Sequence, residues 1–472
     1  MDKAKEKENL NVNKNIHNEN DNNKKEEMEN VDTQKKVTLP NEQKNKIETI
    51  SNFNKIEETH KEKENKENSP KEKNNTNNCQ EENNKVQNPP TKKKYRKEIP
   101  ISEWKCRSID QYKILKDSPV GEGSFGKVFK AYYKGSKEYA QKYKIPELVA
   151  LKLIKTQNEK EGFPITALRE IMIMRRLDHK NILRLLEVIT SNDPIKKEAY
   201  LVFEYMEHDL GSILLCNVKY QKSHIKFILN QLLLGLQYLH KNNVLHRDIK
   251  TVNILVNNEG GIKIGDFGLS RIFSEYNIKK YTNRVVTLWY RAPELLLGET
   301  SYKGEIDIWS LGCVFWEILT GIPLFKGDKE KEVFKKICKL LGNPDEKNWP
   351  GVSKYKNYKN IMPEKKYRYI LEEKIKEDKN LNPNNFDDVT INLLKRMICI
   401  NPKNRISIED ALNHPYFSTP PLMCKQEEMP KIEEELHYHA LKMKYQNQIQ
   451  IAKKDYNQKN NNFIGKKRKI SS

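Results

Sequence analysis

Hydrophobic and polar positions change their spacing once along the middle of the chain. Residues 112–155 form short runs, YKILKDSPVG, KVFKAYY and LVALKLI, separated by turn residues, which is typical of β-strands. Residues 164–178 begin at a proline and predict a helix, whose apolar positions are Leu168, Ile171, Met172 and Leu177. Residues 306–321, IDIWSLGCVFWEILTG, are largely apolar and end at a glycine, which indicates a buried core helix. Strands followed mainly by helices predict an α+β fold, with a small sheet-rich lobe joined to a larger helical lobe.

The two ends of the chain lack this patterning. Residues 1–90 contain 17 Lys, 19 Asp and Glu, 22 Asn and a single aromatic, Phe53. Such a segment cannot bury enough apolar surface to offset the entropy lost on ordering, so we expect residues 1–98 to be a disordered Asn/Lys/Glu-rich tail. Residues 418–472 form a C-terminal extension, in which positions 431–456 have helix-compatible spacing. That stretch is either an extra helix docked on the folded domain or on a partner, or a partly helical solvated tail.

Composition and charge exclude several classes of protein. The chain has 472 residues and a formal net charge of +21, to which residues 1–90 contribute −2. There is no run of 18 apolar residues and no apolar stretch near the N-terminus, so we expect neither a membrane span nor a secretory signal. The seven cysteines include no CxxC pair, which argues against a disulfide framework or a zinc site. The charge alone fits a basic, non-catalytic scaffold that binds nucleic acid, but no basic motif interleaved with aromatic residues supports direct nucleic-acid binding.

A glycine-rich turn and a strand lysine are the first candidate phosphate ligands. Gly121, Gly123 and Gly126 have the G-x-G-x-x-G spacing, which lets a backbone approach phosphate oxygens. A strand, KVFKAYY, follows them instead of a helix, which favours a phosphate-covering hairpin over a dinucleotide site. Lys152 lies in the apolar strand VALK and can reach a phosphate, and Glu170 on the following helix can orient it by an ion pair. Each signal is weak alone, since glycine turns and strand lysines are common.

Two later motifs are more specific. In HRDIKTVN, Asp248 can accept or orient a hydroxyl proton, Lys250 can neutralise a transferring phosphoryl group, and Asn253 can hold a divalent ion. In DFG, Asp266 follows the strand IKIG, a position suited to Mg²⁺. Chance does not readily supply all four motifs in this order.

With these motifs the sequence resembles the eukaryotic protein kinases over about residues 112–417. The resemblance also includes the APE motif at 292–294, DIW at 307–309 and Arg405. It implies the bilobal protein-kinase fold, with ATP and Mg²⁺ as cofactors. It further implies that Asp248 is the catalytic base, that Lys152 contacts the α- and β-phosphates, and that Glu294 pairs with Arg405. Lys250, two residues after Asp248, is the serine/threonine-kinase pattern.

The resemblance also implies an ATP pocket. The adenine is expected at the hinge, Glu204 to Met206, behind Phe203, and the ribose beside Asp209. Val120, Val128, Ala150 and Leu255 are expected to pack against the nucleotide. Two departures from the family pattern are Gly265, which precedes DFG where alanine is usual, and the longer stretch 136–147, which we expect to be a loop extension of the small lobe.

Within the kinases, the sequence is most similar to the cyclin-dependent kinases. The segment PITALRE, residues 164–170, resembles the helix that a cyclin grips in that family, and the mechanical reason is that Glu170 must pair with Lys152. Thr282 stands at the family's activating phosphosite, which implies an activating kinase. The expected phosphate-binding arginines are Arg169, Arg247 and Arg271. The pocket expected for a proline after the target Ser/Thr consists of Val285, Val286 and Arg291.

The segments EGFPITALRE, YLVFEYMEHDL and YTNRVVTLWYR look most similar to the transcription kinases, which phosphorylate the C-terminal repeat domain of RNA polymerase II. Ser124-Phe125 stands in place of the inhibitory Thr-Tyr pair of cell-cycle members, and phenylalanine cannot be phosphorylated. The resemblance therefore implies a proline-directed Ser/Thr kinase in transcription, with a cell-cycle kinase acting on other Ser/Thr-Pro substrates as the alternative. Basic clusters at 92–97 and 466–469 fit nuclear import, although lysine-rich ends arise easily in such a chain, and a cytoplasmic pool stays open.

Overall fold

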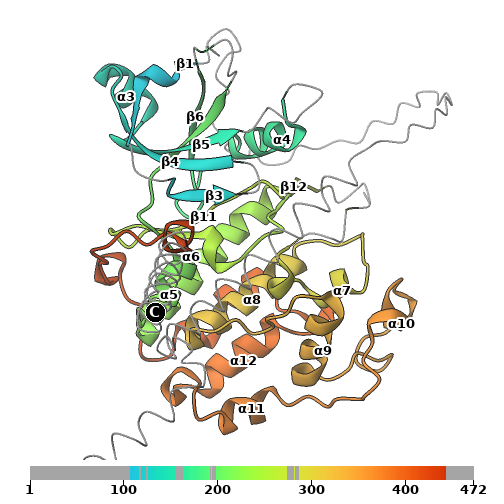
Figure 1. Cartoon of the computed structure of the whole chain (residues 1–472). Coiled ribbons are helices and arrows are strands. Elements are labelled where there is room, and N and C mark those ends of the chain that lie inside the picture. Colours follow the sequence, from blue (N-terminus) through green and yellow to red (C-terminus); the bar gives the residue numbers. More distant parts are fainter. Residues whose placement is uncertain are drawn as a thin grey trace, which may run out of the picture. The chain divides into compact units, whose positions relative to one another are not determined.

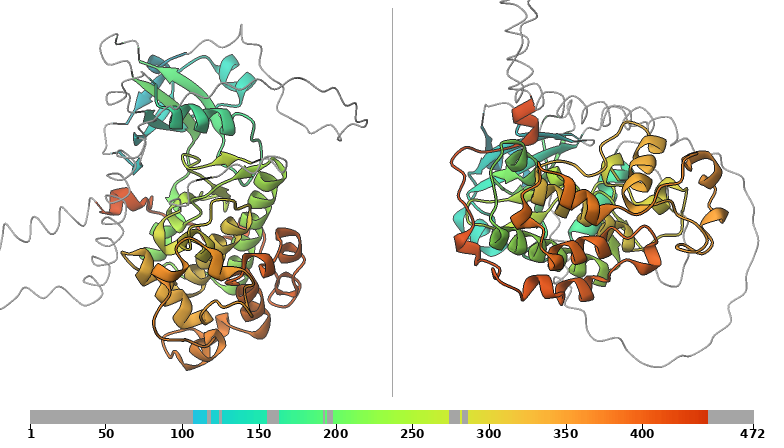
Figure 2. Two further views of the ribbon diagram at one scale, coloured as in Figure 1. Left: turned by 90° about the vertical axis from the view of Figure 1, so that its right-hand side faces the viewer. Right: turned by 90° about the horizontal axis from the view of Figure 1, so that it is seen from below.

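The computed structural model describes residues 107–115, 119–123, 126–154, 163–191, 193, 198–273, 281 and 286–442. These residues form a small lobe of strands and a larger lobe of helices, as the sequence predicts (Figures 1 and 2). The expected N-terminal tail, both basic clusters, Ser124-Phe125, Thr282 and Val285 lie outside the described residues. Among the helices that are described, none is both long and apolar enough to cross a membrane.

The N-lobe is built around a seven-stranded sheet with the order β1-β6-β7-β5-β4-β2, in which β3 also pairs with β4. All of its pairings are antiparallel except that between β1 and β6. Its strands are β1 (Arg107–Ser108), β2 (Tyr112–Ile114), β3 (Gly121–Gly123), β4 (Gly126–Tyr133), β5 (Leu148–Ile154), β6 (Leu185–Thr190) and β7 (Ala199–Glu204). Alternating side chains of β4 and β5, such as Ala131, Val149 and Leu151, are fully buried in a small apolar cluster. The strands predicted within 112–155 are therefore present.

The stretch 136–147 is not the loop extension that the sequence predicts. It contains a helix, α3 (Lys137–Tyr143), which Ser136 caps by accepting a hydrogen bond from the Tyr139 backbone N–H. The Arg107 guanidinium lies 3.7 Å from the centroid of the Tyr139 ring, and the Tyr139 hydroxyl donates to Glu187. The prediction failed because tertiary contacts to an arginine 32 positions earlier stabilise a helix too short to be recognised by periodicity.

The helix predicted at 164–178 is α4 (Ile165–Met174), and Pro164 occupies its N-cap as expected. It lies on a different side of the N-lobe from α3 (Figure 1). Its buried face is formed by Ala167, Glu170, Ile173 and Met174. Ile165, Leu168 and Met172 point outward, with exposed fractions of 61%, 46% and 57%. The apolar positions of this helix thus form two stripes, and one of them has no partner among the described residues.

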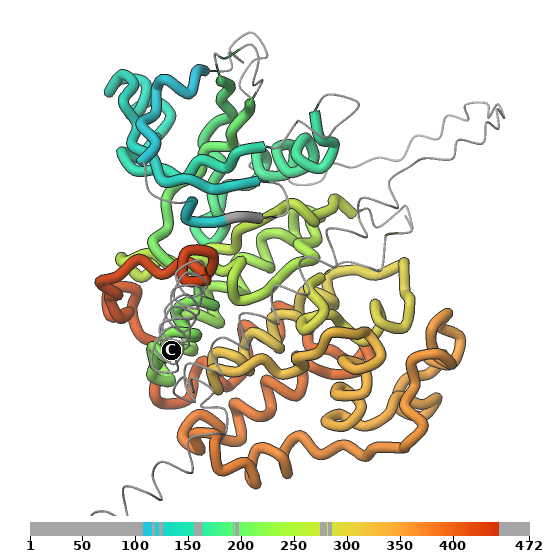
Figure 3. Tube along the Cα trace, in the orientation of Figure 1, coloured from blue at the N-terminus to red at the C-terminus, as the bar shows by residue number. Residues whose placement is uncertain are grey.

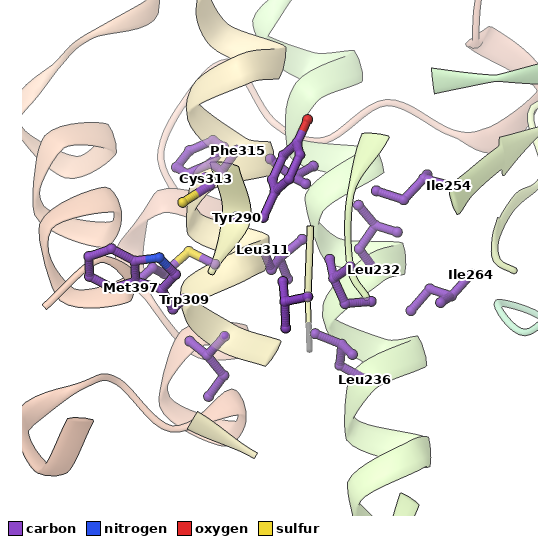
Figure 4. Packing of buried hydrophobic residues seen from close by; sticks show 14 of the residues in the cluster. Leu232, Leu236, Ile254, Ile264, Tyr290, Trp309, Leu311, Cys313, Phe315 and Met397 are labelled. Atoms are coloured by element: carbon purple, nitrogen blue, oxygen red, sulfur yellow. The ribbon is translucent and has the colours of Figure 1, made fainter. Parts of the chain in front are cut away.

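The C-lobe is organised around α8 (Glu305–Thr320), which is the buried core helix that the sequence predicts. All of its residues from Ile306 to Leu319 are buried, and it ends at Gly321, whose φ of +77° favours glycine. Its side chains pack against α6 (Lys222–Lys241) and α12 (Asp388–Met397), and Trp309, Leu232 and Met397 lie in this core (Figure 4). The core gives the loops above it a rigid support.

The remaining C-lobe elements surround this core. The strands are β8 (His208–Asp209), β9 (Val244–Leu245), β10 (Ile254–Val256), β11 (Ile262–Ile264) and β12 (Arg271–Ile272), in sheets β11-β10-β8 and β12-β9. The helices are α5 (Leu210–Leu215), α7 (Pro293–Leu296), α9 (Glu330–Leu341), α10 (Tyr358–Ile361), α11 (Leu371–Glu377) and α13 (Ile408–Leu412). Two short 3₁₀ turns that matter for the site are η3 (Thr251–Asn253) and η4 (Leu288–Tyr290).

The C-terminal segment returns to the hinge between the lobes (Figure 3). Leu436 forms a parallel bridge with His208 in β8, and Met429 and Leu436 are buried in the C-lobe core. Residues 438–442 are helical, whereas 431–437 are not, and 443–456 lie outside the described residues. The sequence left open whether residues 431–456 dock on the folded domain or form a solvated tail. Their described part docks on the folded domain.

Candidate active site

Lys152 forms a buried ion pair with Glu170 inside the N-lobe and also contacts Asp266 of the C-lobe. Lys152 Nζ in β5 lies 2.7 Å from Glu170 Oε1 in α4 and 3.4 Å from Asp266 Oδ1. Burial disfavours the lysine charge, but the two carboxylates outweigh it and raise the pKa of Lys152. The ion pair between Lys152 and Glu170 of α4 is therefore formed in this structure. Lys152 stays protonated and lies beside the Asp266 carboxylate.

The glycine-rich residues form a hairpin, as predicted, because Gly121 pairs with Val128 and Gly123 with Gly126. Gly126 has a φ of +154°, and a Cβ there would lie 1.6 Å from the Leu153 carbonyl oxygen. Only glycine fits this close approach of β4 to β5. In the same sheet Val128 lies opposite Lys152. The hairpin is therefore held directly beside the lysine.

The catalytic-loop residues converge on Asp248. Lys250 Nζ lies 3.0 Å from Asp248 Oδ2, and Asn253 Nδ2 donates to the same oxygen at 3.0 Å. Thr287, from the segment before η4, donates its backbone N–H and its hydroxyl to Asp248 Oδ1, each at 3.1 Å. Lys250 Nζ also donates to Thr287 Oγ1 at 3.1 Å. The structure thus brings together the predicted residues and adds Thr287, which the sequence reasoning missed.

Asn253 and Asp266 fit a divalent cation. The amide nitrogen of Asn253 is used by Asp248, which leaves its carbonyl oxygen as a ligand, and the Asp266 side chain is 34% exposed. Burial would raise the pKa of Asp266, but Lys152 and Lys250 outweigh it and lower that pKa, so the carboxylate is ionised. No group of three or more metal-ligating side chains occurs in the described part of the chain. Two protein oxygen ligands suit Mg²⁺, which usually keeps several waters and binds substrate phosphate oxygens as well.

The expected adenine-side residues lie along β5, the hinge and β10. Ala150 lies opposite Phe203 in the sheet, Phe203 and Met206 are buried, and Leu255 lies opposite Asp209. The Glu204 carboxylate forms an ion pair with Lys263 at 3.0 Å and accepts a hydrogen bond from the Arg184 backbone N–H. Val120 directly precedes β3. That these residues surround an adenine stays a prediction.

Asp209, expected beside the ribose, is more enclosed than the sequence indicates. Its carboxylate accepts hydrogen bonds from the Ser212 backbone N–H, the Ser212 hydroxyl and the Tyr438 backbone N–H at 2.8, 2.7 and 2.6 Å. Burial raises its pKa to about 6, although these donors oppose the shift. The C-terminal segment therefore forms one side of this corner of the site, which no local sequence signal reveals.

The pocket expected for a substrate proline is partly described. Val286 has a φ of +67°, and its carbonyl accepts hydrogen bonds from Arg291 Nε and Nη2 at 3.2 and 3.0 Å. Arg291 also pairs with Glu330 at 2.7 Å. Further into the C-lobe, Arg405 and Glu294 form the predicted ion pair through two bonds of 2.8 and 3.1 Å. Both arginines also bind backbone carbonyls, Arg291 that of Val286 and Arg405 those of Glu305 and Cys399.

Comparison with known proteins agrees with this geometry. Residues 114–417 match the family model "Protein kinase domain". The chain is 42% identical over 326 residues to cyclin-dependent kinase C-3 of Oryza sativa subsp. japonica, covering 66% of this chain and 93% of that one. The chain belongs to the protein kinase family, among the cyclin-dependent kinases.

Other relatives of this kinase are longer than the matched region. It is 41% identical to cyclin-dependent kinase C-1 of the same rice, covering 73% of this chain and 65% of that relative's length. It is 43% identical to CTD kinase subunit alpha of Schizosaccharomyces pombe, covering 64% of this chain and 47% of that one. A chain of the yeast RNA Pol II CTD kinase CTDK-1 complex has a similar structure, with a TM-score of 0.59 and 36% identity. That match covers 68% of this chain and 97% of the other.

The three arginines predicted to bind a phosphate interact through their charges with one another or with Tyr302. Burial lowers the pKa of Arg169, and the positive charge of Arg247 acts in the same direction. Arg247 Nη1 donates to the Tyr302 hydroxyl at 2.8 Å, and the charges of both Arg247 and Arg271 act on Tyr302. Thr282 lies outside the described residues, so its place relative to the arginines stays a prediction.

The kinase also uses residues that the sequence reasoning did not assign to its site. Asp307 in the first turn of α8 accepts the backbone N–H groups of His246 and Arg247 at 3.0 and 2.9 Å. His246 Nε2 bonds the Gly265 carbonyl oxygen at 2.9 Å, so the unusual glycine before DFG keeps this link. Arg247 and Asp266 have φ values of +66° and +56°. The DIW motif was the one available signal for Asp307.

Proposed function

We propose that this protein is a cyclin-dependent Ser/Thr protein kinase that transfers the γ-phosphoryl group of ATP to Ser/Thr-Pro sites. The observation that carries the proposal is the set of contacts made by Asp248 with Lys250, Asn253 and Thr287. Asp248 accepts or orients the proton of the substrate hydroxyl, and Lys250 and Lys152 bind the negative charge of the phosphates. Asn253 and Asp266 hold Mg²⁺, which neutralises phosphate charge when bound.

The preference for proline follows from the Val286 carbonyl. Arg291 uses this carbonyl, so an N–H of the substrate residue after the target finds no acceptor there. A residue with an N–H would leave that donor unsatisfied, whereas proline has none. Val285 is proposed as the other wall of this pocket.

The proposed substrate is the C-terminal repeat domain of RNA polymerase II. Its support is the similarity to CTD kinase subunit alpha and to the yeast RNA Pol II CTD kinase CTDK-1 complex. The proposed partner is a cyclin that covers the exposed face of α4, because Ile165, Leu168 and Met172 present apolar surface there. An activating kinase would phosphorylate Thr282, and a nuclear location fits these roles.

The test is an assay of the purified kinase–cyclin complex on a repeat-domain peptide and on histone H1. We expect clear preference for the repeat-domain peptide and loss of transfer when the proline after the target is replaced by alanine. Asp248→Asn is the matched control, and it should lower turnover by about 10²- to 10⁴-fold. Preference for histone H1 would instead favour a cell-cycle kinase, and cellular function that survives Asp248→Asn would favour a scaffold.

A further inference from the structure

One buried carboxyl next to the catalytic loop has no role in the steps above. Glu317 lies in the last turn of α8 and is 5% exposed. Its Oε1 accepts a hydrogen bond from the Thr251 hydroxyl at 3.2 Å, and its Oε2 accepts one from the Tyr290 hydroxyl at 2.7 Å. The two hydroxyl oxygens lie 3.3 Å apart. The three side chains therefore form a cluster inside the C-lobe in which both hydroxyls donate to the Glu317 carboxylate.

The cluster joins the two segments that meet at the reaction centre. Thr251 directly follows Lys250 in the catalytic loop, and Tyr290 ends η4, the turn that begins after Thr287. Thr287 and Lys250 already connect these segments through Asp248. Glu317 supplies a second connection, from the rigid core helix.

This second connection complements the anchor at the other end of α8. Asp307, in the first turn, holds the backbone of His246 and Arg247, where the catalytic loop begins. Glu317, in the last turn, holds Thr251, near the end of the same loop. A single buried helix thus fixes the loop at two points and reaches the substrate-facing segment through Tyr290.

The surroundings of Glu317 indicate that it contributes little to the stability of the fold. No ion pair of Glu317 occurs within the described ranges, and the groups that face it are Thr251, Tyr290 and the Cys313 thiol of its own helix. Burial raises the pKa of Glu317 to about 7, although the two hydroxyl donors oppose the shift. A buried carboxyl without a cation is costly, so its hydrogen bonds indicate a role in placing the two segments.

We propose that Glu317 is a positioning residue for phosphoryl transfer, which fixes the catalytic loop against the substrate-facing segment through Thr251 and Tyr290. This inference rests on the kinase activity proposed above. The ionised carboxylate accepts both hydroxyl donors at once. When Glu317 is protonated, one of its oxygens carries a proton and acts as a donor, so it accepts the hydroxyl hydrogen bonds less well. The contacts with Thr251 and Tyr290 therefore weaken as pH falls through about 7.

The test compares Thr251→Val, Tyr290→Phe and Glu317→Gln in the kinase–cyclin complex, with Glu305→Gln as the control from the first turn of α8. We expect each of the three to lower kcat by about 3- to 10-fold, the effect of losing a hydrogen bond, with little change in the KM for ATP. Combining Thr251→Val with Glu317→Gln should cost little more than one change alone. The wild type should lose kcat as pH falls below about 7, and Glu317→Gln should lack this inflection.

A second measurement does not need turnover. Amide hydrogen exchange of residues 246–253 and 286–291 should be faster in the three variants than in the wild type or in Glu305→Gln. Unchanged exchange, or unchanged kcat and pH profile, would overturn the inference. If the wild type shows no kinase activity but the three variants still exchange faster, only the proposed activity is contradicted, and the positioning role of Glu317 stands.

Discussion

Tyr438 donates its backbone N–H to Asp209 Oδ2 at 2.6 Å, although 229 positions separate the two residues. The same C-terminal segment also contacts the hinge and the N-lobe. Glu435 accepts a hydrogen bond from the Tyr205 hydroxyl at 2.8 Å and pairs with Lys130 of β4. The C-terminal extension is therefore part of the hinge region and donates to the carboxylate that is predicted to lie beside the nucleotide ribose.

The Tyr438 contact predicts an effect on nucleotide affinity. Tyr438→Pro removes the N–H that Asp209 accepts, whereas the control Tyr438→Ala keeps it. Because the ribose hydroxyls then meet an Asp209 oxygen without a competing donor, we expect the KM for ATP to fall by about 3- to 10-fold, equivalent to about 1 kcal/mol. Steady-state kinetics of both variants measures this. A higher KM in Tyr438→Pro would mean that the segment supports the bound nucleotide.

His437 predicts how pH acts on the same segment. Burial lowers the pKa of His437 from 6.5 to about 4, and its Nε2 lies 3.1 Å from the Tyr205 hydroxyl. The unfolded chain therefore binds a proton at a higher pH than the folded chain, and stability from this group is lost as pH falls from 6.5 toward 4. Between pH 7 and pH 5 the loss is about 2 kcal/mol.

Urea unfolding at both pH values, compared with His437→Gln, isolates this contribution. The glutamine variant keeps a polar side chain but does not titrate, so it should lose about 2 kcal/mol less than the wild type between pH 7 and pH 5. Equal losses in the two proteins would show that His437 titrates as it does in the unfolded chain.

The Glu294–Arg405 pair predicts a large effect on stability. The side chains are 3% and 0% exposed, and Arg405 also donates to the backbone carbonyls of Glu305 and Cys399. Glu294→Gln leaves a buried guanidinium without its counter-ion, so we expect the free energy of unfolding to fall by about 3–5 kcal/mol. The double change Glu294→Gln with Arg405→Met should recover part of that loss. A double variant no more stable than Glu294→Gln would contradict the charge-based explanation.

The outward face of α4 predicts how cyclin binding is lost. Met172→Asp and Leu168→Asp place charges on a surface that the proposed cyclin must desolvate, so affinity should fall by at least about tenfold. Leu422→Asp is the control, since Leu422 is 62% exposed and lies in the C-terminal extension. Binding of the purified cyclin measures the effect, and melting temperatures check that all three variants fold. Equal affinity in all of them would place the partner elsewhere.

Much of the catalytic site was predictable because its residues sit in short, ordered motifs. The glycine hairpin, Lys152, Asp248, Asn253 and Asp266 each follow or lie in a strand or loop that the local pattern indicates. The outcome for α4 was mixed. Its position was predicted, but periodicity could not show that Leu168 and Met172 face outward, because two apolar stripes on one helix look alike in sequence.

The residues that were missed act over long separations. Thr287 is 39 positions from Asp248, and Glu317 is 66 positions from Thr251. Neither has a distinctive local pattern, because a threonine before a 3₁₀ turn and a glutamate in an apolar helix are common. The helix α3 was also missed, since its stability depends on Arg107 and Glu187.

The sequence by itself determined the two-lobed architecture and the family, because both depend on residue types at short, fixed spacing. Only the tertiary structure decided that α8 anchors the catalytic loop at both Asp307 and Glu317 and that the C-terminal segment closes on Asp209. The physical reason is that a hydrogen bond depends on atoms within about 3 Å, and chain folding alone brings such distant residues together.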